Sequence, residues 1–182
     1  MRKVVLYHLQ SLDGVGEEPS DWMSDSGAGV FDNLGTVIET QDDILLGRRT
    51  YDYWVGYWPN SDVEPFASFI NSTSKHVFTS SALGEEWANS TVVDGSASEY
   101  AAQLKQGDGG DIGIHGSIDL SRALLRADVV DELRLVVAPS LANKGRRIFT
   151  GNEDLGLRKL ELRESGVTDG GSLLLWYRLV SA

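Results

Sequence analysis

The sequence has 182 residues, a length typical of one domain, and 41% of them are hydrophobic, which is enough to form a core. It has no cysteine, which excludes disulfides, thiolate nucleophiles and cysteine-ligated zinc, and its three histidines form no HxxxH pair, so no metal site is expected. With 27 acidic and 16 basic residues, its net charge of −11 argues against nucleic-acid binding.

No stretch has the pattern of a secretory signal or a membrane span. The N-terminus carries two basic side chains, but the apolar run at 3–9 is too short for either. The lack of cysteine also fits a reducing compartment. We therefore expect a cytoplasmic protein that forms a single domain over residues 1–182 and does not contact membranes.

Apolar runs and helical patterns alternate along the first two thirds of the chain. Runs rich in β-branched and aromatic residues predict strands covered on both faces. In chain order, we predict a strand at 3–9, a weaker helix at 27–39, a strand at 43–47, a helix starting near 50, a weaker helix at 64–71, strands at 75–81 and 90–93, a helix at 97–105, a strand at 111–116 and a helix at 118–127. This alternation is typical of a parallel sheet with helices on its faces.

The last third has a different pattern. Residues 131–139 alternate apolar and polar side chains until Pro139 ends the run. Two further apolar segments, 158–165 and 172–180, flank the turn sequence TDGG and predict a hairpin. The predicted fold class is therefore α/β, with a central, mostly parallel mixed sheet, helices on both faces and an antiparallel C-terminal hairpin.

The stretch DDILLGRRTYDYW, residues 42–54, places two arginines between a predicted strand and a predicted helix. Gly47 permits a close turn, and Thr50 is a good N-cap for a helix with Asp52 in its first turn. Free amides at such a helix start attract an anion, and Arg48 and Arg49 would add charge-assisted contacts. The stretch is a plausible phosphate cradle, although the arginines could equally balance the neighbouring aspartates.

A second stretch, DIGIHGSIDLSRALL at 111–125, has the same order of strand, glycine, small polar residue and helix. Gly116 allows close backbone approach, and Ser117 could cap the helix, although glycine and serine also begin ordinary helices. Two such junctions in one sheet are more specific, because ligands of open α/β sheets bind outside the carboxyl ends of the strands. SLDG at 11–14 is a common turn sequence that would lie at the same edge.

Other features admit a structural explanation. Trp22, Tyr51, Trp54 and Trp58 could wall a planar heterocycle, but aromatic residues are more often core. GRRIF at 145–149 follows a loop and leads into no helix, so we interpret it as loop or strand edge. The acidic residues at 17, 18 and 21 read as solvated loop charges. No Ser-His-Asp order or paired-carboxylate pattern favours hydrolysis.

Taken together, the stretches SLDG, ILLGRRTYDYW, HVFTSS, IGIHGSIDLSRALL and DVVDELRLVVAPSLANKGRRIF occur in the order and spacing of one family. The chain resembles the dihydrofolate reductase-like family that includes the reductase domain of bacterial riboflavin biosynthesis. The resemblance covers nearly the whole length. It implies hydride transfer from NADPH to a small-molecule substrate, and a homodimer formed through the C-terminal strands.

The resemblance also implies roles for individual residues. The residues expected to bind NADPH are Ser11, Gly14, Gly47, Arg48, Arg49, Thr50, Thr79, Ser80, Ser81, His115, Gly116, Ser117 and Ile118. Arg48 would lie near the adenosine 2′-phosphate and Thr50 near the pyrophosphate. The residues expected to border the substrate are Leu12, Trp22, Tyr51 and Trp54. The carboxylates expected at the reacting centre are Asp13 and, as the nearest match to the helix carboxylate of dihydrofolate reductase, Asp32.

Three functions are compatible with the sequence. The first is an NADPH-dependent reductase of a small heterocyclic substrate, resembling a pteridine or pyrimidine, or of a carbonyl compound, since the protein need only align the nicotinamide with an electron-poor double bond. The second is a nucleotide- or metabolite-binding protein on the same fold without turnover. The third is a structural or interaction module, which only the acidic surface supports.

Overall fold

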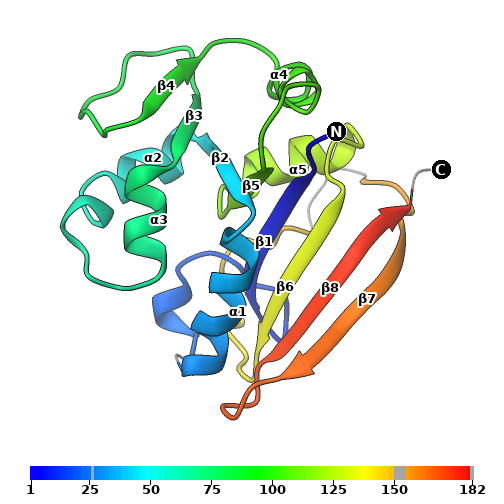
Figure 1. Cartoon of the computed structure of the whole chain (residues 1–182). Helices are drawn as coiled ribbons and strands as arrows, with labels where there is room; N and C mark the ends of the chain where they lie inside the picture. The colour runs from blue at the N-terminus through cyan, green and yellow to red at the C-terminus, as the bar shows by residue number, and fades with distance from the viewer. Residues whose placement is uncertain (26, 150–154, 181–182) are drawn as a thin grey trace.

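The computed structural model describes residues 1–25, 27–149 and 155–180, which contain one mixed sheet with helices on both faces (Figure 1). The strands are β1 (Val4–Ser11), β2 (Gln41–Gly47), β3 (Ser74–Phe78), β4 (Ser90–Val93), β5 (Asp111–His115), β6 (Glu132–Ala138), β7 (Lys159–Val167) and β8 (Leu173–Val180). The helices are α1 (Ala28–Ile38), α2 (Arg48–Trp54), α3 (Phe66–Ser72), α4 (Ala97–Leu104) and α5 (Ile118–Arg126), with 3-10 turns at Pro19–Asp21 and Trp58–Asn60.

The strand order is β4-β3-β2-β5-β1-β6-β8-β7. The first six strands in this order pair in parallel, whereas β8 pairs antiparallel with β6 and β7 pairs antiparallel with β8. Because β5 lies between β1 and β2, the carboxyl ends of these three strands meet at one edge of the sheet (Figure 1). The predicted mostly parallel sheet and the C-terminal hairpin are both confirmed.

Apolar side chains cover both faces of the sheet, as its buried strands require. On one face, α4 and α5 pack on the inward residues of β1, β5 and β6, among them Leu6, Ile114 and Leu133. On the other face, α1, α2 and α3 pack on residues such as Ile44 and Val77. Within the described residues, no helix has the length and apolar character needed to cross a bilayer.

Two local predictions, both of helix caps, are wrong. Thr50 does not cap α2, because the helix already begins at Arg48, with the extended backbone of Gly47 in the N-cap position. Thr50 therefore lies inside the first turn and Asp52 lies beyond it, where Asp52 accepts a hydrogen bond from Arg48 Nε at 2.7 Å. Ser117 precedes α5 as predicted, but its left-handed backbone, with φ of 57°, prevents the side chain from capping that helix.

Candidate functional site

Two adjoining depressions open at the carboxyl ends of β1, β2 and β5. The arginine cleft, with a volume of about 680 Å³, lies over the starts of α2 and α5 and includes Arg48, Arg49 and Arg146 in its lining. The apolar pocket, with a volume of about 490 Å³, lies between the end of β1, the helix α1 and the segment after α2. The residues that line both are Gly16, Pro19, Ser20, Trp54 and Gly116.

The arginine cleft brings together the two strand-to-helix junctions that the sequence singles out. Gly47, Arg48, Arg49 and Thr50 line it from one side, and Gly116, Ser117 and Ile118 from the other. Ser117 joins the two sides: its Oγ accepts a hydrogen bond from the Gly47 N–H at 3.0 Å and donates to Thr50 Oγ1 at 2.8 Å. The cleft therefore has a fixed floor of small polar groups.

Arg48 connects this cleft to the segment after β3. Its Nη1 donates to Ser81 Oγ and to the Ala82 carbonyl, both at 2.8 Å, while its Nε pairs with Asp52. The cleft lining includes Phe78 but not Thr79, Ser80 or Ser81. Of the three predicted residues beyond β3, the structure thus brings Ser81 against Arg48, while Thr79 bonds to Ser81 and lies outside the lining.

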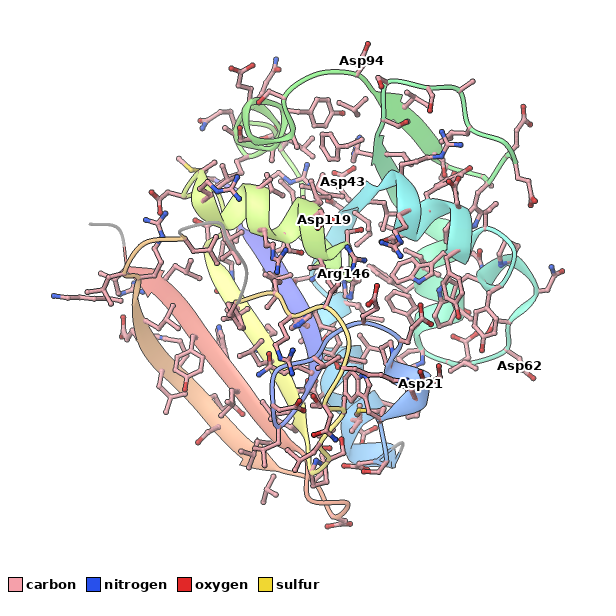
Figure 2. All side chains as sticks on the ribbon, turned by 180° about the vertical axis from the view of Figure 1, so that it is seen from behind. Asp21, Asp43, Asp62, Asp94, Asp119 and Arg146 are labelled. Atoms are coloured by element: carbon pink, nitrogen blue, oxygen red, sulfur yellow. The ribbon has the colours of Figure 1, made fainter. Side chains whose placement is uncertain are left out.

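Arg146 is a cleft residue that the sequence analysis missed. It hydrogen-bonds Glu17 at 2.8 Å and Asp119 at 2.9 Å, and Figure 2 shows it beside Asp119 on α5. Arg49, by comparison, is 75% exposed and lies 3.6 Å from Glu17. The repetition of Gly-Arg-Arg at 47–49 and 145–147 is the signal that could have pointed to this loop.

The apolar pocket is walled mainly by aromatic and aliphatic side chains. Its aromatic residues are Tyr7, Phe31, Trp54, Tyr57, Trp58 and Phe66. Phe66 packs edge-on against Trp54 and Trp58, with ring centroids 5.6 Å and 4.8 Å apart, so these rings form one rigid side. A flat apolar molecule would find extensive contact here.

Two histidines of this pocket are buried and uncharged. Burial lowers the pKa of His8 to about 4 and that of His115 to about 3. The Nε2 of His115 lies 2.7 Å from Gln41 Oε1, whereas the Nε2 of His8 has no partner among the described residues. His115, predicted to contact the cofactor, therefore lines the apolar pocket and not the arginine cleft.

The carboxylate in the apolar pocket is Asp25, and not the predicted Asp32. Asp25 is 5% exposed and accepts hydrogen bonds from the hydroxyl of Thr168 and from the N–H of Gly27. Helix α1 presents Val30, Phe31 and Leu34 to the pocket, which leaves Asp32 exposed outside both lined surfaces. Nothing in the local sequence marks Asp25, because its position depends on the distant hairpin turn.

The Asp25 contacts predict a pH-dependent stability. Hydrogen bonds lower the Asp25 pKa from 3.8 to about 2. The largest contribution comes from the Thr168 hydroxyl, and the N–H of Gly27 adds to it. A depressed carboxyl pKa stabilises the fold above the unfolded value, and this contribution is lost as the pH falls from about 4 to about 2. We expect Asp25→Asn to lower the melting temperature at pH 7 and the difference from wild type to shrink toward pH 2.

Thermal unfolding followed by circular dichroism at pH 7, 4 and 2.5 measures this difference. Asp62→Asn, which removes an exposed carboxylate from a loop (Figure 2), is the matched control and should not shift the melting temperature at any of these pH values. A constant difference for Asp25→Asn across the range would contradict the assignment.

The SLDG segment forms a tight turn beside the two depressions without lining either of them. Ser11 is fully buried and donates to Asp13 Oδ1, which also accepts from the N–H of Ala142. The Ser11 hydroxyl and the Ala142 amide, with Asn143 and Arg147, hold the pKa of Asp13 well below its usual range. Asp13 therefore anchors a loop, Gly14 supplies the turn with φ of 84°, and Leu12 is exposed.

Of the four predicted substrate contacts, only Trp54 lines the depressions described above. Tyr51 is fully buried between α2 and the sheet, and its hydroxyl donates to the Glu85 carbonyl at 2.9 Å. Trp22 packs with Val15 and Ala138. Tyr51 and Trp22 therefore belong to the core, since both are buried and neither lines either of the two depressions.

Comparison with known proteins connects this site to a family. The model of the RibD C-terminal domain matches residues 2–174. The chain is 32% identical over 152 residues to the uncharacterised protein YwjB of Bacillus subtilis (strain 168), a match that covers 81% of this chain and 83% of that protein. YwjB therefore supports a relationship without supplying an activity.

Solved structures show the same fold. A protein from Shewanella sp. PV-4, described only as a candidate riboflavin-biosynthesis protein, aligns with a TM-score of 0.79 at 18% identity, covering 98% of this chain and 99% of that one. Dihydrofolate reductase of Enterococcus faecalis, complexed with NADP(H), aligns with a TM-score of 0.67 at 15% identity and covers 98% and 97%. These identities show the fold alone, which is dihydrofolate reductase-like.

The Thermotoga maritima diaminohydroxyphosphoribosylaminopyrimidine deaminase/5-amino-6-(5-phosphoribosylamino)uracil reductase aligns with a TM-score of 0.69 at 16% identity, over 98% of this chain and 57% of that longer chain. The family model covers nearly the whole sequence, from residue 2 to residue 174. The chain belongs to the RibD C-terminal domain family.

Proposed function

We propose that this protein is an NADPH-dependent reductase that transfers a hydride to a small heterocyclic substrate, resembling a pteridine or pyrimidine, or to a carbonyl compound. The observation that carries the proposal is the junction between the arginine cleft and the apolar pocket, at Gly16, Trp54 and Gly116. A cleft that presents arginines to a nucleotide and an apolar pocket for a flat acceptor thus share one wall. The family, which includes reductases of riboflavin biosynthesis, supports the same reaction type.

The residues of the arginine cleft fit the phosphates of NADPH. Arg48 offers a guanidinium already oriented by Asp52 and Ser81, suited to the adenosine 2′-phosphate. Thr50 and Ser117 offer hydroxyls beside the start of α5, whose first amides have no partner within the helix. NADPH would supply the hydride, while Gly116 and Trp54 would hold its reactive ring against the apolar pocket.

The apolar pocket supplies little acid–base chemistry near neutral pH. Burial raises the pKa of the Tyr7 phenol and lowers those of His8 and His115, and Asp25 is ionised. In the proposed reaction, the proton that accompanies the hydride therefore comes from solvent. The same observation favours the second candidate, a nucleotide- or metabolite-binding protein without turnover.

The proposal predicts a measurable cofactor preference. NADPH should quench the tryptophan fluorescence, because Trp54 lines the cleft, and it should bind more tightly than NADH. Oxidation of NADPH, followed at 340 nm with pterins, deaminated pyrimidines and quinone-like carbonyls, separates the two candidates. Saturable oxidation with any of them excludes the non-catalytic alternative, and equal, weak quenching by both cofactors would refute NADPH binding.

We also propose that the protein acts in the cytoplasm as a homodimer joined through the C-terminal hairpin. No helix covers the hairpin in Figure 1, and its side facing the α4 and α5 layer carries apolar side chains. The exposed members of this strip, which we call the hairpin strip, are Leu160 (43%), Leu162 (51%), Val167 (67%) and Leu173 (43%). A contiguous exposed apolar strip is typical of a protein interface.

Introducing charge into this strip should separate the subunits. We expect Leu160→Glu combined with Leu162→Glu to halve the mass measured by light scattering after gel filtration, because two buried carboxylates would lack partners. Val180→Glu is the control, since Val180 is similarly exposed but lies on the opposite side of the hairpin. A wild-type protein of monomer mass would exclude the dimer.

A further inference from the structure

The apolar pocket has an unusual charge balance for a reductase of phosphorylated substrates. Its lining contains no arginine and no lysine among the described residues, and its ionised group is Asp25. Asp25 is 5% exposed, so solvent screens its negative charge less than that of a surface carboxylate. A phosphate or carboxylate placed in this pocket would meet a like charge and no compensating cation.

The pocket also contains buried polar atoms without partners. The hydroxyl of Tyr7, Nε2 of His8 and Nε1 of Trp58 are buried and make no hydrogen bond to the part of the chain that the structure describes. Buried polar groups usually have hydrogen-bond partners. We therefore expect these three atoms to bond to a bound molecule, or to water that the molecule displaces. Uncharged polar atoms at the edge of a flat ring would meet this need without an additional charge.

The cations nearest to this region belong to the other depression. Arg48, Arg49 and Arg146 line the arginine cleft and are absent from the lining of the apolar pocket. A substrate phosphate held inside the apolar pocket would therefore contact none of these three arginines. Phosphate recognition and substrate recognition are therefore separated between the two depressions.

We infer that the substrate is an uncharged, planar heteroaromatic molecule that carries neither a phosphate nor a carboxylate tail. This inference rests on the proposed function for the identity of the pocket, and it narrows the substrate class. It distinguishes this chain from the Thermotoga maritima enzyme, whose reductase substrate is a phosphoribosylamino compound. The volume of about 490 Å³ accommodates one to three fused rings.

Paired ligands test the inference directly. Isothermal titration calorimetry, with and without saturating NADPH, would compare pterin with folic acid, riboflavin with FMN, and uridine with UMP. We expect at least one tail-free compound to bind, and to bind about tenfold or more tightly than its acidic counterpart, as repulsion between unit charges at low screening implies. An acidic member that binds as tightly as its tail-free partner, or the failure of all tail-free compounds, overturns the inference.

Two variants test the electrostatic cause. Asp25→Asn should reduce several-fold the ratio of the dissociation constants of the acidic and the tail-free member of a pair. Tyr57→Lys should do the same by adding a cation at the rim, and it is expected to fold because Tyr57 is 52% exposed. Asp62→Asn is the matched control, since Asp62 is exposed and lines neither depression, and it should leave the ratio unchanged. A ratio insensitive to both pocket variants would overturn the argument.

The result is independent of the cofactor proposal. NADPH titrated alone reports on the arginine cleft, whereas the paired compounds titrated alone report on the apolar pocket. If the protein does not bind NADPH but still prefers the tail-free compounds to the acidic ones, the proposed function alone is refuted. If the protein binds NADPH but prefers the acidic compounds, the substrate inference alone is refuted.

Discussion

Replacing Arg48 with alanine is expected to abolish the preference for NADPH over NADH and to weaken NADPH binding by about 10- to 100-fold, the loss typical of a hydrogen-bonded charge pair. Binding of NADH, which lacks the 2′-phosphate, should change little. The physical reason is the preset guanidinium: Asp52 and Ser81 hold Arg48 at the cleft wall before any ligand binds. Less conformational freedom is therefore lost when a phosphate arrives.

Arg49→Ala is the matched control for this experiment. Arg49 adjoins Arg48 in sequence and lines the same cleft, but it is 75% exposed and has only a 3.6 Å contact with Glu17. Its removal should lower the affinity for both cofactors slightly and leave their ratio intact. Dissociation constants from fluorescence titration at two salt concentrations measure both effects, and equal losses of preference in the two variants would assign the discrimination to general charge.

The fold could be predicted because its determinants are local. Apolar runs such as 43–47 and 111–116 are short and ended by glycine, so their length and flanking residues predict strands. Their alternation with helical patterns predicts the parallel sheet, and the TDGG turn predicts the hairpin. The two junctions around Gly47 and Gly116 then follow, since parallel strands end at the same edge.

The parts of the site that could not be predicted depend on contacts between distant segments. Asp25 is fixed by Thr168, which lies 143 residues away in sequence, so no pattern near Asp25 reveals its role. Asp13 similarly bonds to the loop at 142–147, which makes it an anchor of that loop. The pocket is instead lined by the residues that follow this turn, notably Gly16 and Pro19.

Helix register explains the remaining errors. Tyr51 belongs to the same core cluster as Ile44 and Leu46, and neither the predicted nor the observed start of α2 defines which face of the helix packs on the sheet. In α1, Asp32 directly follows Phe31, and one position rotates a side chain by about 100°, which is enough to move it off the pocket wall. Sequence patterns define helices more reliably than they define which residue faces a ligand.

Replacing Gly116 with alanine is expected to reduce kcat/KM by about 100-fold, the loss that misalignment of reacting groups by about 1 Å can produce. Gly116 lines both depressions and has φ of 73°, a left-handed conformation that side chains disfavour. An added Cβ would lie 3.7 Å from Trp54 and 3.9 Å from Thr50, in ordinary contact with both. The methyl group therefore fits the protein but occupies the junction between the depressions.

Backbone strain and obstruction of the junction must be separated, and Gly95→Ala does so. Gly95 also has positive φ, 126°, but a Cβ there would meet nothing within 4 Å. Both variants should lose about 1–2 kcal/mol of unfolding free energy from the strained backbone. Only Gly116→Ala should also weaken NADPH quenching and turnover. If Gly95→Ala loses as much activity as Gly116→Ala, backbone strain explains the loss and obstruction of the junction does not. In the proposed site, the hydride donor and acceptor meet at the wall that the two depressions share. The proposal therefore requires Gly116→Ala to lose more activity than Gly95→Ala.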